Sequence, residues 1–254
     1  MSAAVKLHRH VGRHRAGRFL AEGPNLVEAA SRRGLVSEVF ATEAALDRFG
    51  SLLGSLKIQA PVHLVTEKAA KALSDTVTPV GLVAVCEVPQ ATLADVLASA
   101  PRLVAVAYEI SEPGNAGTLI RIADAMGAAA VVLAGNSVDP YNGKCLRAST
   151  GSIFSIPVVE EPDAAAAVSL LRAGGLQTLA TTVDGEIDLD AAESLLGAPT
   201  AWLFGPESQG LPAEVAALAD RRVRITMPGS AESLNVAAAA AICLYQSARA
   251  ARFN

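Results

Sequence analysis

The chain has few cysteines, and their arrangement indicates no pairing. Cys86, Cys145 and Cys243 are odd in number and widely spaced, and no CxxC motif occurs. This pattern disfavours a disulfide framework and a zinc site, and it favours reduced thiols in a cytoplasmic protein. We therefore expect each thiol to behave as a small buried hydrophobic side chain.

Long apolar runs are also missing. Hydrophobic residues make up 51% of the 254 residues, which supports a substantial core in one large or two modest domains. The longest apolar runs, such as residues 236–244, are too short and too rich in alanine to cross a bilayer. No apolar stretch follows the charged N-terminus, so we expect neither a membrane anchor nor a signal peptide.

Motifs of several enzyme classes are absent. No G-x-G-x-x-G motif joins a strand to a helix and no G-x-x-x-x-G-K-[ST] loop occurs, which argues against a nicotinamide-dependent oxidoreductase on an open α/β sheet. No HExxH motif or His/Cys cluster predicts a metal site. Three of the four histidines lie within the first 14 residues, so Ser-His-Asp catalysis has little support.

Acidic residues are absent before Glu22. The net charge of −4 argues against a general nucleic-acid binder, but residues 1–18 form a basic arm. Such an arm can contact phosphates through counterion release, whereas a solvated, partly disordered N-terminus fits the same composition. The candidate phosphate contacts are Arg9, Arg13, Arg15 and Arg18.

Residues 19–90 show the pattern of a small α/β unit. Short β-type runs alternate with amphipathic runs, and Gly34 is the predicted stop of the first helix. The predicted strands are 19–22, 37–42, 62–65 and 80–88, and the predicted helices are 25–33, 42–56 and 67–75. A helix-like run over 91–100 then leads to Pro101, and the pattern changes around residues 90–101, where we place a domain boundary.

From residue 102 onward, unbroken apolar runs alternate with helical patterns. This alternation predicts a parallel sheet covered on both faces, with ligands beyond the carboxyl ends of its strands. The predicted strands are 103–108, 130–135, 176–183, 201–205 and 223–226, and the clearest predicted helices are 118–128 and 164–175.

The first of three unusual segments after these strands is EISEPGNAGTLIRIADAMGA. It predicts a helix whose apolar stripe of Leu119, Ile122, Ala123 and Met126 faces the sheet. Arg121 lies off that stripe, near the helix N-terminus, where a guanidinium suits a phosphate or a developing oxyanion. An exposed arginine on an ordinary capped helix has the same local pattern.

The other two segments lie near the C-terminus. GPESQGLP is a tight loop that places Glu207 beyond a strand end, although a solvated glutamate in a turn fits equally well. VRITMPGSAESLNVAAAAAICLY joins a strand through a Pro-Gly loop to a long helix, with Ser233 or Asn235 as the predicted N-cap. Unpaired N–H groups at such a helix start suit a ligand.

In this order the three segments resemble the motifs of the SpoU (TrmH-like) family of RNA ribose 2′-O-methyltransferases, in the SPOUT superfamily. EPGNAGTLIRIADAMGA is similar to the first motif, LFGPESQGLP to the second and ITMPGSAESLNVAAAAAICLY to the third. FLAEGPNLVEAA resembles, more loosely, the family's L30e-like substrate-binding domain. The resemblance implies a small L30e-like α/β RNA-binding domain over residues 1–95. It also implies a catalytic α/β domain over residues 101–254, whose parallel sheet has a C-terminal trefoil knot.

The resemblance further implies a cofactor and an assembly. S-adenosylmethionine is the expected methyl donor, bound within the knot without a metal, and a homodimer is the expected assembly. By motif position, the expected cofactor contacts are Gly205, Ile225, Leu234, Thr181 and Thr182.

By motif position, the expected catalytic residues are Asn115, Arg121, Glu207, Ser233 and Asn235. The family's arginine has been given the role of general base, but a guanidinium is hard to deprotonate. We expect Arg121 to bind the RNA phosphate and to stabilise a developing alkoxide. Asn115 is expected to hold Arg121 or the ribose, Ser233 and Asn235 to shape the cofactor loop, and Glu207 to anchor Arg121 or loop N–H groups.

Two positions depart from the family pattern. Pro228 follows Met227, whereas the third motif commonly has Ile-Pro-Met, and Ile122 stands where the first motif often has threonine. Neither change removes a group assigned to catalysis.

Ribosomal RNA and tRNA are both substrates within the family. A separate L30e-like domain favours 23S ribosomal RNA, by analogy at the level of the fold. A tRNA 2′-O-methyltransferase and a catalytically inactive RNA-binding protein of the same fold are the alternatives.

Overall fold

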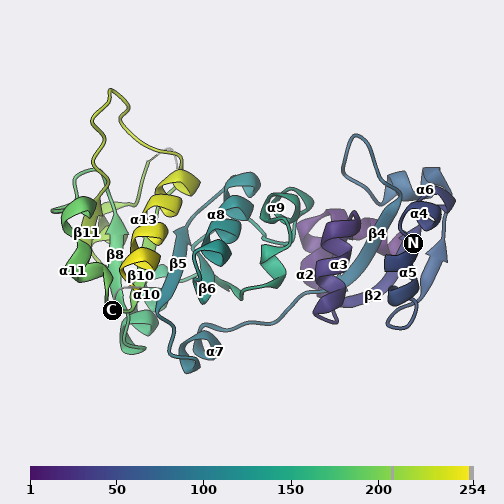
Figure 1. Ribbon diagram of the computed structural model, residues 1–254, viewed down its shortest axis with the longest axis horizontal. Coiled ribbons are helices and arrows are strands. Elements are labelled where there is room, and N and C mark those ends of the chain that lie inside the picture. Colours follow the sequence, from purple (N-terminus) through teal and green to yellow (C-terminus); the bar gives the residue numbers. More distant parts are fainter. Residues whose placement is uncertain (207–208, 252–254) are drawn as a thin grey trace. The chain divides into compact units, whose positions relative to one another are not determined.

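The computed structural model describes residues 1–206 and 209–251. The chain forms two compact units (Figure 1). Unit 1 contains Met1–Gln90 together with Asp139–Phe154, and unit 2 contains Ala91–Val138 together with the chain from Ser155 onward. Within the described residues, no helix combines the length and apolar character that are needed to cross a membrane.

Unit 1 is built on a four-stranded mixed sheet. Its order is β1 (Arg18–Glu22), β4 (Leu82–Glu87), β2 (Val36–Ala41) and β3 (Val62–Leu64). The strands β1 and β2 run antiparallel to β4, and β3 runs parallel to β2. The accompanying helices are α3 (Pro24–Arg32), α4 (Glu43–Arg48), α5 (Gly50–Leu56) and α6 (Glu67–Ala72).

One predicted helix of unit 1 is two helices. The pattern of residues 42–56 predicts a single helix, but α4 ends at Arg48 and α5 begins at Gly50. Phe49 lies between them with φ −118° and ψ 28°, outside helical geometry. Gly50 and Gly54 lower the helix propensity at this point, because glycine gains more backbone freedom than other residues when a helix opens.

The basic arm is helical, which contradicts the alternative of a partly disordered N-terminus. It forms α1 (Ser2–Val5), the 3₁₀ helix η1 (Lys6–His8) and α2 (His10–Ala16). Arg13 is buried, and its Nε and Nη2 atoms lie 2.7 and 2.6 Å from Oδ2 of Asp139. Its Nη1 atom donates to the carbonyl oxygens of Leu7 and His8 at 2.8 and 2.9 Å.

The partner of Arg13 comes from a distant segment that packs within unit 1. Residues 139–154 carry α9 (Gly143–Ser149) and the 3₁₀ helix η2 (Ser152–Phe154), which the sequence patterns did not predict. The ring of Phe19 lies 5.0 Å from that of Tyr141 and 5.9 Å from that of Phe154, centroid to centroid. A buried aromatic cluster and a buried ion pair therefore attach this segment to β1 and α2.

Unit 2 contains a seven-stranded sheet in which all neighbouring strands are parallel. Its order is β7 (Val158–Glu161), β6 (Ala130–Ala134), β5 (Leu103–Tyr108), β10 (Thr200–Phe204), β8 (Gln177–Thr181), β11 (Arg221–Arg224) and β9 (Ile187–Asp188). The parallel α/β sheet that the alternating pattern predicts is confirmed. The strands β7 and β9, at the two edges, were not predicted.

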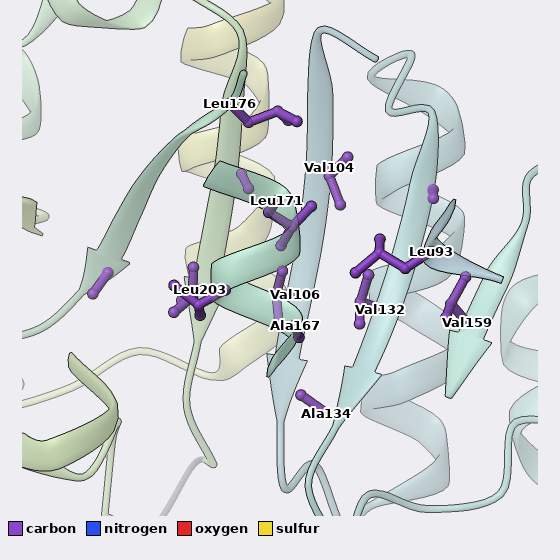
Figure 2. Close-up of a cluster of buried hydrophobic side chains, with 14 of the residues drawn as sticks. Leu93, Val104, Val106, Val132, Ala134, Val159, Ala167, Leu171, Leu176 and Leu203 are labelled. Carbon is purple, nitrogen blue, oxygen red and sulfur yellow. The ribbon is translucent and has the colours of Figure 1, made fainter. Parts of the chain in front are cut away.

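Helices cover both faces of this sheet, as Figure 2 shows. The helices α8 (Pro113–Ala125) and α13 (Val236–Ala250) contact β5, and α10 (Ala164–Ala173) contacts β7, β8 and α7 (Leu93–Ala98). Leu93 of α7 and Leu171 of α10 pack in one apolar cluster with strand residues that include Val104, Val132 and Leu203 (Figure 2). Further short helices are η3 (Leu189–Ala191), α11 (Glu193–Leu196) and α12 (Ala213–Ala216).

The buried face of α8 differs in part from its prediction. Leu119 and Ala123 are fully buried as predicted, whereas Ile122 and Met126 are only half-buried. Ala116, Gly117 and Ile120 complete the buried face. The helix starts at Pro113, so the residues that meet the sheet follow the spacing 116, 119, 120 and 123.

All three cysteines are buried and free, as their composition predicted. Burial raises the pKa of the Cys145 thiol to about 12 and also raises the pKa of Cys86 and of Cys243. The neutral thiol is thus favoured at all three positions, which is how a small core side chain behaves.

The pair of Arg13 and Asp139 generates a stability prediction. Arg13→Ala leaves the Asp139 carboxylate buried without its cation, so we expect a loss of about 3–5 kcal/mol in unfolding free energy. Arg15→Ala, an exposed change in the same helix, should alter it by less than about 0.5 kcal/mol. Urea unfolding followed by circular dichroism measures both, and equal losses would show that the pair has no special role.

Candidate functional site

A cavity of about 550 Å³ opens in unit 2 at the carboxyl ends of β8, β10 and β11. Thr181 ends β8 and Thr182 follows it, Gly205 follows β10, Ile225 follows β11, and Leu234 precedes α13; all five residues line the cavity. The structure thus brings all five predicted cofactor-binding residues to one cavity. Because the strands are parallel, these loops leave the same edge of the sheet.

The loop after β10 has room for glycine alone at its first position. A Cβ atom on Gly205 would lie 2.2 Å from the backbone nitrogen of Leu211 and 2.3 Å from the carbonyl carbon of Gly210. Gly210 has φ +66°, and its N–H donates to the carbonyl oxygen of Pro206 at 2.9 Å. The loop therefore folds back on itself beside the cavity. Glu207, a predicted catalytic residue in this loop, lies outside the described residues.

The two threonines at the end of β8 have different partners. Thr181 Oγ1 donates to the carbonyl oxygen of Leu203 at 2.6 Å and so joins β8 to β10. Thr182 Oγ1 is buried and has no hydrogen-bond partner among the described residues. A buried hydroxyl without a hydrogen-bond partner is energetically unfavourable unless a ligand supplies that partner. Apolar residues form much of the remaining wall, including Phe204, Leu211 and Ile225, so the cavity suits a flat ring system with a few polar groups.

The helix starts of α8 and α13 meet through two amides. Asn235 is the N-cap of α13, since its Oδ1 accepts from the N–H of Ala237 at 2.9 Å. Its Nδ2 donates to Oδ1 of Asn115 at 3.1 Å. Of the two predicted N-caps, Asn235 fills the position, and Ser233 lines the cavity instead. The structure therefore pairs two predicted catalytic residues that lie 120 positions apart.

Arg121 lies on α8, exposed to solvent. No ion pair joins it to a carboxylate within the described residues, and it is not among the described residues that line the cavity. Its exposed guanidinium can contact an anion, and its role toward a phosphate stays a prediction.

Asp184 and Arg222 are among the charged residues of the cavity wall that the sequence analysis missed. Asp184 and Arg222 both line the cavity, and Oδ2 of Asp184 lies 3.2 Å from Nη1 of Arg222. Arg222 also pairs with Glu186 at 3.0 Å, and a hydrogen bond from the backbone N–H of Arg222 lowers the pKa of that carboxyl. The acidic run DGEID opposite RRVR could have revealed them, because opposite charges pair across neighbouring strands.

The predicted RNA contacts of unit 1 are not equivalent. Arg9 and Arg15 are exposed on the helical arm, and Arg18 is exposed on β1, with an ion pair to Glu87 at 2.9 Å. Arg13 is buried against Asp139. We therefore do not retain Arg13 as a candidate phosphate contact.

Comparisons with known proteins agree with the motifs. A model of the SpoU rRNA Methylase family matches residues 102–245, and a model of the MRM3-like substrate binding domain matches residues 2–84. A Bacillus subtilis (strain 168) protein named 23S rRNA (guanosine(2553)-2′-O)-methyltransferase RlmP is 34% identical over 244 residues, which are 94% of this chain and 92% of that protein.

A second relative and a solved structure come from Streptomyces viridochromogenes. A protein named 23S rRNA (uridine(2479)-2′-O)-methyltransferase is 32% identical over 243 residues, 93% of this chain and 84% of that protein. The crystal structure of the SpoU methyltransferase AviRb, in complex with the cofactor AdoMet, has a TM-score of 0.85 and 30% identity. It covers 97% of this chain and 95% of that one.

The tight loop at Gly205 generates a second prediction. Gly205→Ala forces the loop after β10 to open, and we expect a loss of about 1–3 kcal/mol in unfolding free energy. Gly229→Ala is the matched control, because open space surrounds Gly229, and its stability should stay near that of the wild type. Thermal unfolding of the wild type, Gly205→Ala and Gly229→Ala measures the three stabilities. Wild-type stability in Gly205→Ala would mean that the loop has another conformation.

Proposed function

The chain belongs to the SpoU rRNA methylase family, and from that premise we propose that it transfers a methyl group from S-adenosylmethionine to a ribose 2′-hydroxyl of 23S ribosomal RNA. The observation that carries this proposal is the cavity that gathers all five predicted cofactor-binding residues. The Bacillus and Streptomyces relatives, whose names specify 23S rRNA, each match more than nine-tenths of this chain, which favours ribosomal RNA over tRNA.

The residues of the cavity fit the proposed cofactor. S-adenosylmethionine supplies an activated methyl carbon when it is bound. The buried Thr182 hydroxyl would donate to or accept from a polar group of the cofactor, and Gly205 lets a ligand approach the backbone. Ile225 and Leu234 would pack against the adenine ring, and Thr181 would keep the ends of β8 and β10 aligned.

The catalytic roles remain those expected from the motifs. Arg121 would bind an RNA phosphate and stabilise negative charge on the ribose oxygen, while it stays protonated. The paired amides of Asn115 and Asn235 would fix the starts of α8 and α13 beside the ribose. Ser233 would shape the cofactor loop, and Glu207 would anchor Arg121 or loop N–H groups.

The finer architecture is also a proposal. We assign residues 1–95 to an L30e-like RNA-binding domain, with Arg9, Arg15 and Arg18 as phosphate contacts, and residues 101–254 to a catalytic domain with a trefoil knot. Support for the knot comes from the loops after β10 and β11, which share one cavity before α13 returns to β5 and β10. We propose a homodimer, supported by the exposed apolar side chains Ile242 and Tyr245 of α13, and a cytoplasmic location, where the proposed substrate is made.

Methyl transfer tests the function directly. We expect labelled methyl from S-adenosylmethionine to enter unmodified 23S rRNA and not tRNA. Arg121→Ala should lower the rate by about 100-fold or more, because a donor to developing charge is lost. Arg121→Lys should also lose most of the rate, because ammonium cannot reproduce the planar guanidinium fork.

Arg172→Ala, which removes an exposed arginine on α10, is the control and should keep full activity. Methyl incorporation into tRNA and not into 23S rRNA would show that tRNA is the substrate. If no methyl group enters naked 23S rRNA or ribosomal particles, the protein is better described as a catalytically inactive RNA-binding protein.

The Thr182 hydroxyl tests the cofactor assignment. Thr182→Val replaces an unpaired buried hydroxyl by a methyl group, so the free protein should be as stable as the wild type or more so. The affinity for S-adenosylmethionine should fall about tenfold, since one hydrogen bond is lost. Thr182→Ser keeps the hydroxyl and should bind normally. Calorimetry gives the affinities, and normal binding by Thr182→Val would exclude this contact.

A further inference from the structure

We infer that Asp188, on the edge strand β9, is a positioning residue that holds the cofactor-binding wall at Ile225 in place. This inference rests on the proposed function, because it concerns affinity for S-adenosylmethionine. Asp188 itself is not among the described residues that line the cavity. Its effect on the cofactor would pass through the two residues that it binds.

Asp188 holds both chain neighbours of Ile225. Its carboxylate accepts from Nε and Nη2 of Arg224 at 3.0 and 2.5 Å, a two-point contact with the guanidinium. The same carboxylate accepts from Oγ1 of Thr226 at 2.6 Å. Ile225 lies between these residues and lines the cavity. One carboxylate therefore fixes the backbone on either side of a cofactor-wall residue.

The segment after β8, which also contributes to the cavity wall, contacts β11. Arg224 Nη1 donates to the carbonyl oxygen of Gly185 at 3.2 Å, and the N–H of Thr182 donates to the carbonyl oxygen of Val223 at 3.1 Å. A Cβ atom on Gly185 would lie 2.6 Å from the backbone nitrogen of Arg224. The segment from Thr182 to Asp188 is thus packed directly on β11, and its first residue carries the unpaired hydroxyl of the cavity.

Stability alone does not explain this arrangement. The side chains of Asp188 and Arg224 are 34% and 45% exposed, and ion pairs at such exposed sites contribute little to folding. The strand β9 has two residues and pairs with β11 only at Ile187 and Asp188. Hydrogen bonds from Arg224 and Thr226 lower the pKa of Asp188, so the carboxylate stays charged at neutral pH. Its three well-aligned contacts constrain geometry more than they add stability.

The first test compares Asp188→Ala with Asp190→Ala in the full chain. Asp190 is exposed two residues further on and serves as the matched control. We expect the dissociation constant for S-adenosylmethionine, measured by calorimetry, to rise about tenfold in Asp188→Ala and to stay unchanged in Asp190→Ala. In the methyl-transfer assay, KM for S-adenosylmethionine should rise while kcat at saturation and KM for RNA stay near wild type.

A second pair of variants keeps the carboxylate and tests its contact with Thr226. Thr226→Val removes the hydroxyl at nearly constant shape, whereas Thr226→Ser retains it. We expect weaker cofactor binding, by about threefold, in Thr226→Val only. This pair remains decisive if Asp188→Ala fails to fold.

The outcomes separate the two proposals. Wild-type affinity in both Asp188→Ala and Thr226→Val would overturn the positioning role and leave the proposed function intact. An equal fall in RNA affinity and cofactor affinity would also overturn it, since a general structural defect would then explain the loss. A wild-type protein that does not bind S-adenosylmethionine would refute the proposed function and the inference together.

Discussion

All seven strands of the larger sheet run in the same direction, and this constraint decides where the cavity forms. In the sheet β8 lies between β10 and β11, although it precedes both in the sequence, so the loops that follow these strands converge from residues 182, 205 and 225. Each of these segments has a local structural feature that allows it to pack closely against the others. Thr181 joins two strand ends, Gly205 allows the backbone to fold back, and Asn235 starts α13 at the same place.

Two of the arginine–carboxylate pairs, Arg13 with Asp139 and Arg224 with Asp188, have different physical roles. Arg13 and Asp139 are nearly fully enclosed, with side chains 8% and 13% exposed, so each charge depends on the other to offset its lost hydration. Arg224 and Asp188 face solvent, where water competes for every contact and little folding energy is gained. The first pair joins distant parts of the chain, and the second fixes the shape of a surface next to a cavity.

Local patterns in the sequence were sufficient to predict the elements that bury continuous apolar runs. The strands β5, β6 and β10 lie in the sheet interior, and apolar side chains cover nearly all of both faces. Edge strands give weaker patterns: β7 ends in two glutamates and β9 has two residues. The motifs located the cavity through Gly205 and Ile225. The opposite charges of Asp184 and Arg222 could have been read as a pair, but only the fold shows that both residues line the cavity. The burial of Arg13 could not be predicted, because its partner lies 126 residues away.

Residues 139–154 belong to unit 1 although the flanking strands β6 and β7 belong to unit 2. The polypeptide therefore passes from one unit to the other three times, near residues 90, 138 and 154. A gene fusion that exchanged only the N-terminal part would leave Asp139, Tyr141 and Phe154 without the partners that cover them. Exchange of the N-terminal segment between genes is therefore disfavoured. A new RNA specificity would arise more readily through successive substitutions on the surface of unit 1.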